Sequence, residues 1–259
     1  MKCGFVSIVG RPNVGKSTLL NSLIGMKLAI TSNVSGTTRN IIEGIYNDSD
    51  SQIVFVDTPG IHKPVHKLGN IMNKKSYNSV DGINAIMFLI DSTKGFGKGD
   101  LFILNRIKDK GVPILLILNK IDLIKDKSVL LEEITKINDI YKFDEVIPIS
   151  AKRNNLGDLI KTIKKYLIDS DKLYDDEELT NVSTRFIMGE FVREKILELT
   201  RDEIPHEVTC LVENYNEEED IVHIQVLIVV DRENIKKIII GKKGSMLKEV
   251  GSRARYDME

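Results

Sequence analysis

Residues 10–17, GRPNVGKS, have the residue types and the spacing that bind a nucleotide phosphate. They fit the pattern G-x-x-x-x-G-K-[ST] at every fixed position. Such a loop points successive backbone N–H groups at an anion, and the helix that follows adds partial positive charge. We expect Lys16 to reach the terminal phosphates and the Ser17 hydroxyl to ligate Mg²⁺. The residues predicted to touch the nucleotide here are Gly10, Arg11, Pro12, Asn13, Val14, Gly15, Lys16, Ser17 and Thr18.

The sequence on either side of this loop predicts the elements that position it. Residues 5–9 (FVSIV) form a short apolar run that is typical of a buried parallel strand. Residues 17–24 (STLLNSLI) place leucine and isoleucine at helical spacing. The alternative is a chance glycine–lysine turn, but the order strand, glycine loop, helix is the context that the motif requires.

Residues 57–60 (DTPG) follow a β-branched strand and supply groups suited to a γ-phosphate and its metal ion. The carboxylate of Asp57 is placed to hold Mg²⁺ through a water molecule. The N–H of Gly60 can approach a γ-phosphate because glycine lets the backbone come close, which makes Gly60 a catalytic candidate together with Lys16. The residues expected in this part of the site are Asp57, Thr58, Pro59, Gly60 and Ile61.

Two further motifs predict which base is bound. The carboxylate of Asp122, in residues 119–122 (NKID), can accept two hydrogen bonds from the N1 and N2 hydrogens of guanine. Adenine lacks this donor pair, so ATP would leave the carboxylate unpaired. Residues 150–152 (SAK) can offer a backbone N–H to guanine O6. Each motif alone is weak, but four in this order, each after a strand, predict a GTP site that includes Asn119, Lys120, Ile121, Asp122, Ser150, Ala151 and Lys152.

Strand-like and helix-like segments alternate from residue 5 to about residue 168, which predicts an α/β GTPase domain over residues 1–168. Its sheet should be mostly parallel and covered on both faces, with ligands at the carboxyl ends of the strands. Residues 27–39, rich in Ser, Thr, Asn and Gly, are expected to be a loop. The expected strands are residues 5–9, 41–46, 53–56, 85–90, 112–118 and 146–149. The expected helices are residues 17–24, 68–80, 101–110, 129–140 and 156–168.

Residues 169–183 are predicted to be an exposed acidic linker, because residues 169–178 hold six acidic residues and a single lysine. The second domain should then span residues 184–259, with helices at 186–200, 233–240 and from 245 onward, and strands at 207–214 and 222–230. This order is similar to the prokaryotic type II KH module, an α+β RNA-binding fold. The sequence stops before the last strand of that pattern, so the KH domain is expected to be incomplete at its C-terminus.

A loop of the second domain has the composition of a nucleic-acid clamp. Ile240-Gly241-Lys242-Lys243-Gly244 resembles the GxxG loop of a KH domain, where glycines permit close approach to a single-stranded backbone. Residues 232–255 hold eight Lys or Arg and two Glu, so their net charge is +6 on a chain whose net charge is −1. The alternative is a helix–turn–helix with a solvated basic face.

Composition excludes several other classes of protein. The net charge of −1 predicts no attraction of the whole molecule to nucleic acid or membrane. Cys3 and Cys210 are the only cysteines, which argues against a disulfide framework or a cysteine-rich metal site and suits a reducing cytosol. No signal peptide and no apolar run of membrane-spanning length is found, so a cytoplasmic protein is expected.

These motifs resemble the Era branch of the translation-factor-related GTPases, which also contains Der and the G domain of MnmE. The resemblance rests on residues 35–39 (SGTTR), on 57–64 (DTPGIHKP), on LYDDEELTN in the linker and on FIMGEFVREKILEL after it. It implies that Thr38, also a catalytic candidate, completes the Mg²⁺ shell with Ser17 and Asp57. Asn40 differs from the Asp or His that the branch usually has at that position.

Position 61 indicates how hydrolysis would be helped. Many GTPases have a glutamine there that orients the attacking water, whereas Ile61 can neither donate nor accept a hydrogen bond. The resemblance implies a K⁺ ion held partly by Asn13, which would offset developing charge beside the phosphates. The alternative for Asn13 is an ordinary loop residue that satisfies its own turn. His62 and His66 are expected to be exposed loop residues.

The leading hypothesis is a slow GTPase switch whose loops gate the KH domain. The resemblance implies binding near the 3′ end of small-subunit ribosomal RNA during 30S subunit assembly, by a monomer. One alternative is a Der- or MnmE-like GTPase that acts on another RNA, although the chain has one phosphate loop and no large helical domain. The other alternative is a regulatory GTPase, peripheral on the inner face of the cell membrane, whose KH part is only scaffold.

Overall fold

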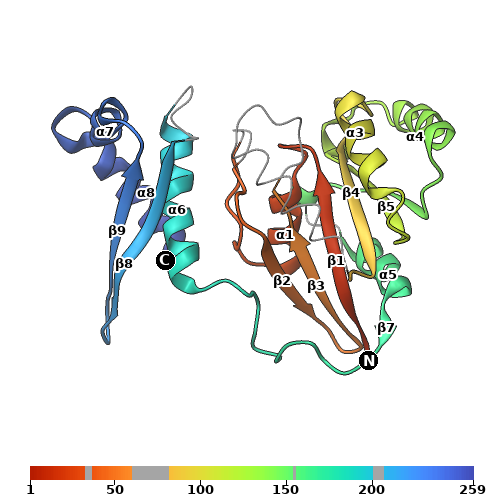
Figure 1. Cartoon of the computed structure of the whole chain (residues 1–259), viewed down its shortest axis with the longest axis horizontal. Helices are drawn as coiled ribbons and strands as arrows, with labels where there is room; N and C mark the ends of the chain where they lie inside the picture. The colour runs from red at the N-terminus through yellow and green to blue at the C-terminus, as the bar shows by residue number, and fades with distance from the viewer. Residues whose placement is uncertain (33–36, 60–81, 154–155, 201–206) are drawn as a thin grey trace. The chain divides into compact units, whose positions relative to one another are not determined.

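The computed structural model describes residues 1–32, 37–59, 82–153, 156–200 and 207–259, which form two compact units (Figure 1). The first unit consists of Met1–Leu28 and Thr38–Asn181, and the second of Ala29–Thr37 and Val182–Glu259. The sequence placed domain boundaries at residues 168/169 and 183/184, and these limits stay a prediction.

A mostly parallel sheet forms the centre of the first unit, as predicted. Its strands in the described residues are β1 (Lys2–Gly10), β2 (Ile42–Asn47), β3 (Ser51–Asp57), β4 (Ala85–Asp91), β5 (Ile114–Asn119), β6 (Glu145–Pro148) and β7 (Ile168–Asp169). Their order is β2-β3-β1-β4-β5-β6, and β7 pairs with β1 beside this path. The pairings of β1 with β3 and β4, and of β5 with β4 and β6, are parallel. Those of β2 with β3 and of β1 with β7 are antiparallel.

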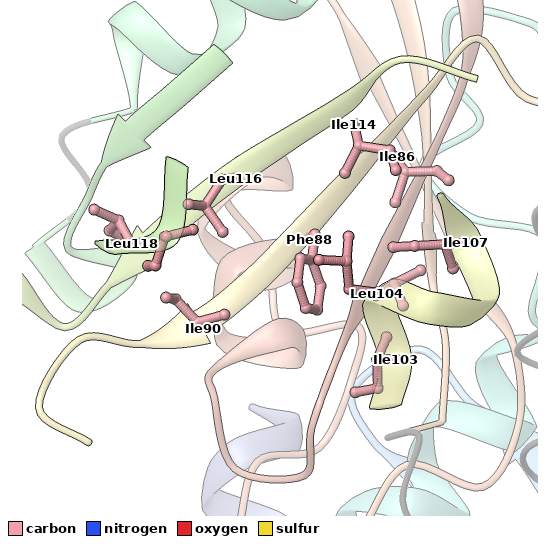
Figure 2. Close-up of a cluster of buried hydrophobic side chains, with 11 residues drawn as sticks. Ile86, Phe88, Ile90, Ile103, Leu104, Ile107, Ile114, Leu116 and Leu118 are labelled. Carbon is pink, nitrogen blue, oxygen red and sulfur yellow. The ribbon is translucent and has the colours of Figure 1, made fainter. Parts of the chain in front are cut away.

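Helices α3 (Lys98–Ile107) and α4 (Ser128–Ile140) cover one face of this sheet. Every residue of β4 and β5 is buried, because central parallel strands are covered on both faces. Figure 2 shows alternate side chains of β4 and β5 lying against the apolar side chains of α3. The buried cluster contains Val9, Ile86, Phe88, Ile90, Ile103, Leu104, Ile107, Ile114, Leu116, Leu118 and Ile137.

The carboxyl ends of the parallel strands meet at one edge of the sheet, where the predicted site residues lie. Strand β1 ends at Gly10, β3 at Asp57, β4 at Asp91 and β5 at Asn119. The register places Asp57 opposite Ile8, and Asp91 opposite Asn119. The packed core behind this edge therefore fixes the carboxyl ends of four different strands.

The segment after residue 163 differs from the sequence prediction. Helix α5 (Gly157–Ile163) ends there, a 3₁₀ turn covers Lys164–Tyr166, and Ile168 lies in β7. The predicted helix over residues 156–168 was therefore too long. The reason is tertiary, since Ile168 pairs with Cys3 of β1 instead of continuing the helix.

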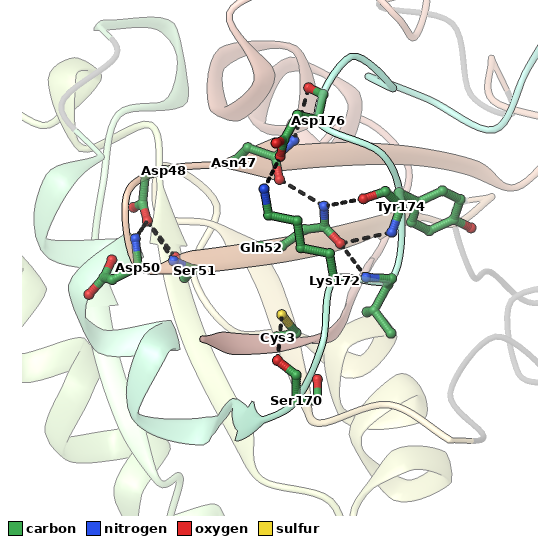
Figure 3. A network of polar contacts seen from close by, with 11 residues as sticks. Cys3, Asn47, Asp48, Asp50, Ser51, Gln52, Ser170, Lys172, Tyr174 and Asp176 are labelled. Carbon is green, nitrogen blue, oxygen red and sulfur yellow. Dashed lines mark hydrogen bonds and ion pairs between the residues drawn. The ribbon is translucent and has the colours of Figure 1, made fainter.

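The acidic linker is mostly exposed, as expected, but it is tied to the β2–β3 hairpin (Figure 3). The side-chain oxygen of Gln52 accepts hydrogen bonds from the backbone N–H groups of Leu173 (2.6 Å) and Tyr174 (2.9 Å). Its amide nitrogen donates to Asn47 Oδ1 (2.8 Å) and to the Tyr174 carbonyl (2.9 Å). Gln52 is fully buried, so these bonds satisfy a polar group that would otherwise be destabilising there.

In the described residues of the second unit, three α-helices pack against a two-stranded antiparallel sheet. Its elements in the described residues are α6 (Thr184–Leu199), β8 (Val208–Glu217), β9 (Val222–Val230), α7 (Glu233–Ile240) and α8 (Ser245–Met258). Ser183 caps α6 by accepting a hydrogen bond from the Phe186 N–H at 3.3 Å. Apolar side chains from all five elements form its core, among them Ile196, Val208, Ile239 and Val250. The order helix, strand, strand, helix, helix agrees with the predicted KH fold.

The segment Ala29–Thr37 belongs to the second unit although it is distant in sequence. Ile30 is buried in a small cluster with Phe191 and Leu197 of α6. The Thr31 N–H donates to Glu194 Oε1 at 2.7 Å. Side chains of α6 therefore contact Ile30 and Thr31, in a stretch that the sequence predicted only as a loop.

Several predictions lie outside the described residues: the helix over 68–80, the residues Gly60, Ile61, His62 and His66, and positions 35 and 36. Among the helices that the structure describes, none combines the length and the apolar composition of a transmembrane span. Cys3 and Cys210 are both buried, and no disulfide joins them.

Candidate nucleotide and RNA sites

The phosphate loop connects β1 to helix α1 (Lys16–Ile24), as the motif predicts. Gly15 precedes the helix with a φ of 101°, which favours glycine. A Cβ at Gly15 would lie 2.3 Å from Asn119 Nδ2, so a side chain there would also clash. No side chain of the described residues caps the N-terminus of α1. Its first N–H groups are therefore suited to binding an anion.

Lys16 is nine-tenths buried at the base of this loop. Its Nζ donates to the carbonyl oxygens of Gly10 (3.3 Å) and Arg11 (3.0 Å). Burial lowers the pKa of Lys16 to about 8, and the charge of Asp57 opposes this shift. A cation that burial destabilises gains from a nearby anion, which fits the predicted contact with a terminal phosphate.

The three predicted Mg²⁺ ligands lie together. The Ser17 hydroxyl donates to Asp57 Oδ2 at 2.8 Å and lies 2.9 Å from the Thr38 hydroxyl oxygen. Asp57 is fully buried, and its Oδ1 has no hydrogen-bond partner in the part of the chain that the structure describes. Burial raises the pKa of Asp57 to about 6, although Lys16 opposes the shift. An orphaned carboxylate oxygen beside two hydroxyls is a set of hard oxygen donors that fits Mg²⁺.

The predicted base site is assembled from three loops. Asn119 Nδ2 donates to the Val14 carbonyl at 2.8 Å, and Asn119 Oδ1 accepts from the Ala151 N–H at 3.0 Å. The Ser150 hydroxyl donates to Asp122 Oδ1 at 2.7 Å, and this bond holds the pKa of Asp122 below its usual range. Asp122 is therefore a fixed, ionised acceptor, as recognition of guanine requires.

The remaining motif residues lie around these groups. Arg11 turns toward α3, where its Nη1 lies 3.3 Å from Asp100 Oδ2. Thr58 donates its hydroxyl proton to the Ile8 carbonyl at 2.8 Å, which fastens the end of β3 to β1. Ile121 and Ala151 begin short 3₁₀ turns, the second of which contains Lys152. Gly60 and Ile61 are the predicted nucleotide contacts that the described residues do not include.

The motifs omit two residues that lie in the same site. Asp91 ends β4 and is 3% exposed, and its Oδ2 lies 2.7 Å from Lys120 Nζ. Thr93 donates to the other oxygen of Asp91. The available signal was the position of Asp91 at the carboxyl end of an apolar strand, which Asp57 and Asn119 share.

The predicted RNA loop lies in the second unit, between α7 and α8. Gly241 has a φ of 72°, and a Cβ there would lie 2.7 Å from Met246 Cβ. The Lys242–Gly244 turn presents two exposed lysine side chains. Neither Lys242 nor Lys243 forms an ion pair within the described residues. Their charges are thus available to an external anion such as a phosphate backbone.

Comparison with known proteins agrees with this architecture. Residues 5–120 match a family model described as 50S ribosome-binding GTPase, and residues 203–259 match a KH domain model. A crystal structure of Era with MgGDPNP and nucleotides 1506–1542 of 16S ribosomal RNA is 42% identical. This chain is covered over 100% of its length and that chain over 89%, with a TM-score of 0.95. A variant of Aquifex aeolicus Era bound to GDP·AlF₄⁻ has the same identity, coverage and TM-score.

A more distant match shows the fold alone. The bacterial selenocysteine-specific elongation factor EF-Sec is 18% identical, with a TM-score of 0.52 over 85% of this chain and 33% of that one. Together, the fold, the phosphate loop and the C-terminal module define a P-loop GTPase joined to a KH domain. The similarity over the full chain is more specific, and this chain belongs to the Era family of GTPases. The fold and the family predicted from the sequence are confirmed.

Proposed function

We propose that this chain is a GTP-driven switch that binds the 3′ end of small-subunit ribosomal RNA and acts in assembly of the 30S subunit. The observation that supports this most is the whole-chain similarity to an Era that was crystallised with MgGDPNP and nucleotides 1506–1542 of 16S ribosomal RNA. The family model for residues 5–120 names the 50S ribosome, but it covers only the GTPase part. The RNA partner should be set by the second unit, so we favour the small subunit.

In this proposal the nucleotide binds at the carboxyl edge of the sheet. Mg²⁺ would be held by Ser17 and Thr38 directly and by Asp57 through water, and it would supply charge neutralisation at the β- and γ-phosphates. Lys16 would exchange its bonds to the loop carbonyls for bonds to phosphate oxygens. Asp122 would accept hydrogen bonds from the guanine N1 and N2 hydrogens, and a backbone N–H of residues 150–152 would donate to guanine O6.

The experiment that tests the proposal compares nucleotides and RNAs. A fluorescent guanine nucleotide should be displaced by GTP and GDP but not by ATP. A single-stranded RNA with the sequence of the 16S 3′ end should bind more tightly in the GDPNP state than in the GDP state. Equal binding of an unrelated RNA would favour a GTPase that acts on another RNA. Co-sedimentation with 50S but not 30S subunits would contradict the small-subunit assignment.

We also propose that K⁺ assists hydrolysis through Asn13. This residue has a φ of 64° in the phosphate loop, a conformation that asparagine tolerates better than most residues. Its side-chain oxygen is of the kind that K⁺ binds, and the cation would offset charge that develops in the transition state. The K⁺ role stays a prediction.

Hydrolysis is expected to be faster in K⁺ than in Na⁺ at equal ionic strength, and Asn13→Ala should abolish the difference. Alanine is strained at positive φ, so Asn13→Gly is the matched control for backbone strain. Glycine adopts this conformation without strain and also removes the side-chain oxygen. Both variants should lose K⁺ stimulation in a phosphate-release assay. If wild-type turnover is equal in the two salts, the K⁺ proposal fails.

The segment Ala29–Thr37 supports a coupling between nucleotide and RNA. Within the second unit, Arg193 Nη2 donates to the Thr37 carbonyl at 2.6 Å, and Arg193 is 1% exposed. The next residue in the chain is Thr38, whose hydroxyl lies beside that of Ser17. We propose that Mg²⁺–GTP, by binding Thr38, shifts the segment that α6 holds and so gates the KH unit.

Arg193→Met should weaken this gating while leaving GTP bound. In wild type we expect RNA affinities in the GDPNP and GDP states to differ by about 5- to 150-fold, the usual range of allosteric coupling. In the variant the ratio should approach one. Arg185→Met is the matched control, because it makes the same substitution at an exposed position of the same helix. An unchanged ratio in Arg193→Met would contradict the coupling.

For location and assembly state we propose a cytoplasmic monomer. The net charge of −1 offers no attraction of the whole molecule to an anionic membrane. Peripheral association with the inner membrane is the competing hypothesis. Flotation with anionic vesicles in each nucleotide state would separate the two, and light scattering would give the mass of the particle.

A further inference from the structure

Asp91 makes contacts that none of the nucleotide-binding motifs describes. It is the last residue of β4, and both of its carboxylate oxygens are engaged. Oδ1 accepts from the Thr93 hydroxyl at 2.6 Å and from the Thr93 N–H at 3.1 Å. Oδ2 accepts from Lys120 Nζ at 2.7 Å. Burial alone would raise the pKa of Asp91, but the bonds from Lys120 and Thr93 outweigh it and keep the pKa below its usual range.

The side chain of Lys120 also links the end of β4 to the phosphate loop. Lys120 Nζ also donates to the Asn13 carbonyl at 2.8 Å. Because Asp91 lies opposite Asn119 in the parallel register, the lysine that follows Asn119 begins beside the end of β4. Lys120 itself has a φ of 66°, and Asn13 has a φ of 64°. The ammonium group of Lys120 thus bonds to the backbone of Asn13, and both residues have a left-handed backbone conformation.

We propose that Asp91, fixed by Thr93, is a positioning residue for nucleotide binding. It holds the Lys120 ammonium against the Asn13 carbonyl and so keeps the phosphate loop in its nucleotide-binding shape. An ammonium group that is held by a buried carboxylate keeps one orientation, whereas the side chain of a solvated lysine samples many orientations. The inference rests on the nucleotide site proposed above, and it adds a residue at β4 that this site requires.

A purely local role for Asp91 is the competing explanation, and the chain contains a comparison for it. Asp126 forms the same turn, accepting at Oδ1 from the Ser128 N–H (2.9 Å) and hydroxyl (2.8 Å). No lysine pairs with Asp126 within the described residues. The turn therefore needs only one carboxylate oxygen, and the bond from Asp91 Oδ2 to Lys120 is additional.

Asp91→Asn is the direct test, because asparagine retains an acceptor for Thr93 and loses the charge that holds Lys120. We expect release of a fluorescent GDP, measured by stopped flow, to become about 10-fold faster, with association little changed. Asp126→Asn should leave the release rate unchanged, because it makes the same substitution in the same kind of turn. Thr93→Val, a milder change, should speed release by about 2- to 5-fold.

A double-mutant cycle decides whether Asp91 acts through Lys120. In a Lys120→Met background, Asp91→Asn and Thr93→Val should cause no further change in GDP release, whereas a merely structural role would give additive effects. A wild-type rate in Asp91→Asn, or additive effects in the cycle, would overturn the inference. If the wild-type protein itself failed to bind GDP, the proposed nucleotide site would fall instead. If the Asp91→Asn variant does not fold, the double-mutant cycle of Thr93→Val with Lys120→Met tests the inference in the same way.

Discussion

Asp122→Asn is expected to lower the affinity for GTP by at least about 10-fold and to raise the affinity for xanthosine triphosphate. The carboxylate of Asp122 is ionised and oriented by the Ser150 hydroxyl, so it presents an acceptor to the guanine N1 and N2 hydrogens. Losing a charged hydrogen-bonded pair is worth roughly 1.5–3 kcal/mol. An amide reverses one of the two bonds, and xanthine carries an oxygen where guanine carries the amino group.

Competition against a fluorescent guanine nucleotide would measure both affinities in both proteins. GTP and xanthosine triphosphate carry the same triphosphate, so a defect in the phosphate loop would weaken the binding of both nucleotides. Only a change at the base site would move them in opposite directions. If Asp122→Asn bound GTP with wild-type affinity, the assignment of residues 119–122 as the base site would be wrong.

The nucleotide site was predictable because its chemistry follows the strands locally. Each motif comes directly after an apolar run, and parallel strands bring their carboxyl ends to one edge of a sheet. Ser17, Thr38 and Asp57 are distant in sequence, yet their side-chain oxygens lie together in the structure. The pattern of residue types and strand order was therefore enough to predict that Ser17 and Asp57 would meet, whereas Thr38 was predicted from the resemblance of residues 35–39 to the Era branch.

Asp91 was not predictable in the same way. An aspartate at the end of an apolar strand is common, and the role of Asp91 depends on Lys120, which directly follows β5 and also contacts the phosphate loop. The same limit applies to Gln52, whose four bonds to the linker and hairpin give no signal in the sequence. Both depend on tertiary contacts between segments more than 25 residues apart.

Helix α6 illustrates a different limit. Arg193, Glu194 and Lys195 are consecutive charged residues, which helical periodicity alone would place partly in solvent. All three are nine-tenths or more buried, because Arg193 bonds to Thr37, Glu194 bonds to Thr31, and Lys195 pairs with Asp257. Their partners belong to a loop and to another helix. The composition of residues 27–39 could predict the loop, but it could not predict that charged side chains of α6 bond to it.

Replacing Lys242 and Lys243 together by Asp is expected to weaken RNA binding by at least about 10-fold at physiological salt and to leave GTP binding unchanged. Both side chains are exposed on the turn between α7 and α8, in a segment of net charge +6. Each lost phosphate contact removes one unit of counterion release, so the salt slope should fall by about 0.7 per contact for a single strand. Aspartate also tolerates the left-handed backbone at position 243, where φ is 51°.

The matched control is Lys136→Glu with Lys161→Glu, which reverses two exposed lysines of the first unit and changes the net charge by the same amount. General electrostatic repulsion would weaken both double variants equally, whereas a clamp at residues 241–244 would weaken only the first. Fluorescence anisotropy with a single-stranded 16S 3′-end RNA, at several salt concentrations, gives affinity and slope together. Equal affinity and slope in wild type and the Lys242/Lys243 variant would exclude this loop as the RNA clamp, because two phosphate contacts cannot be reversed in charge without changing counterion release.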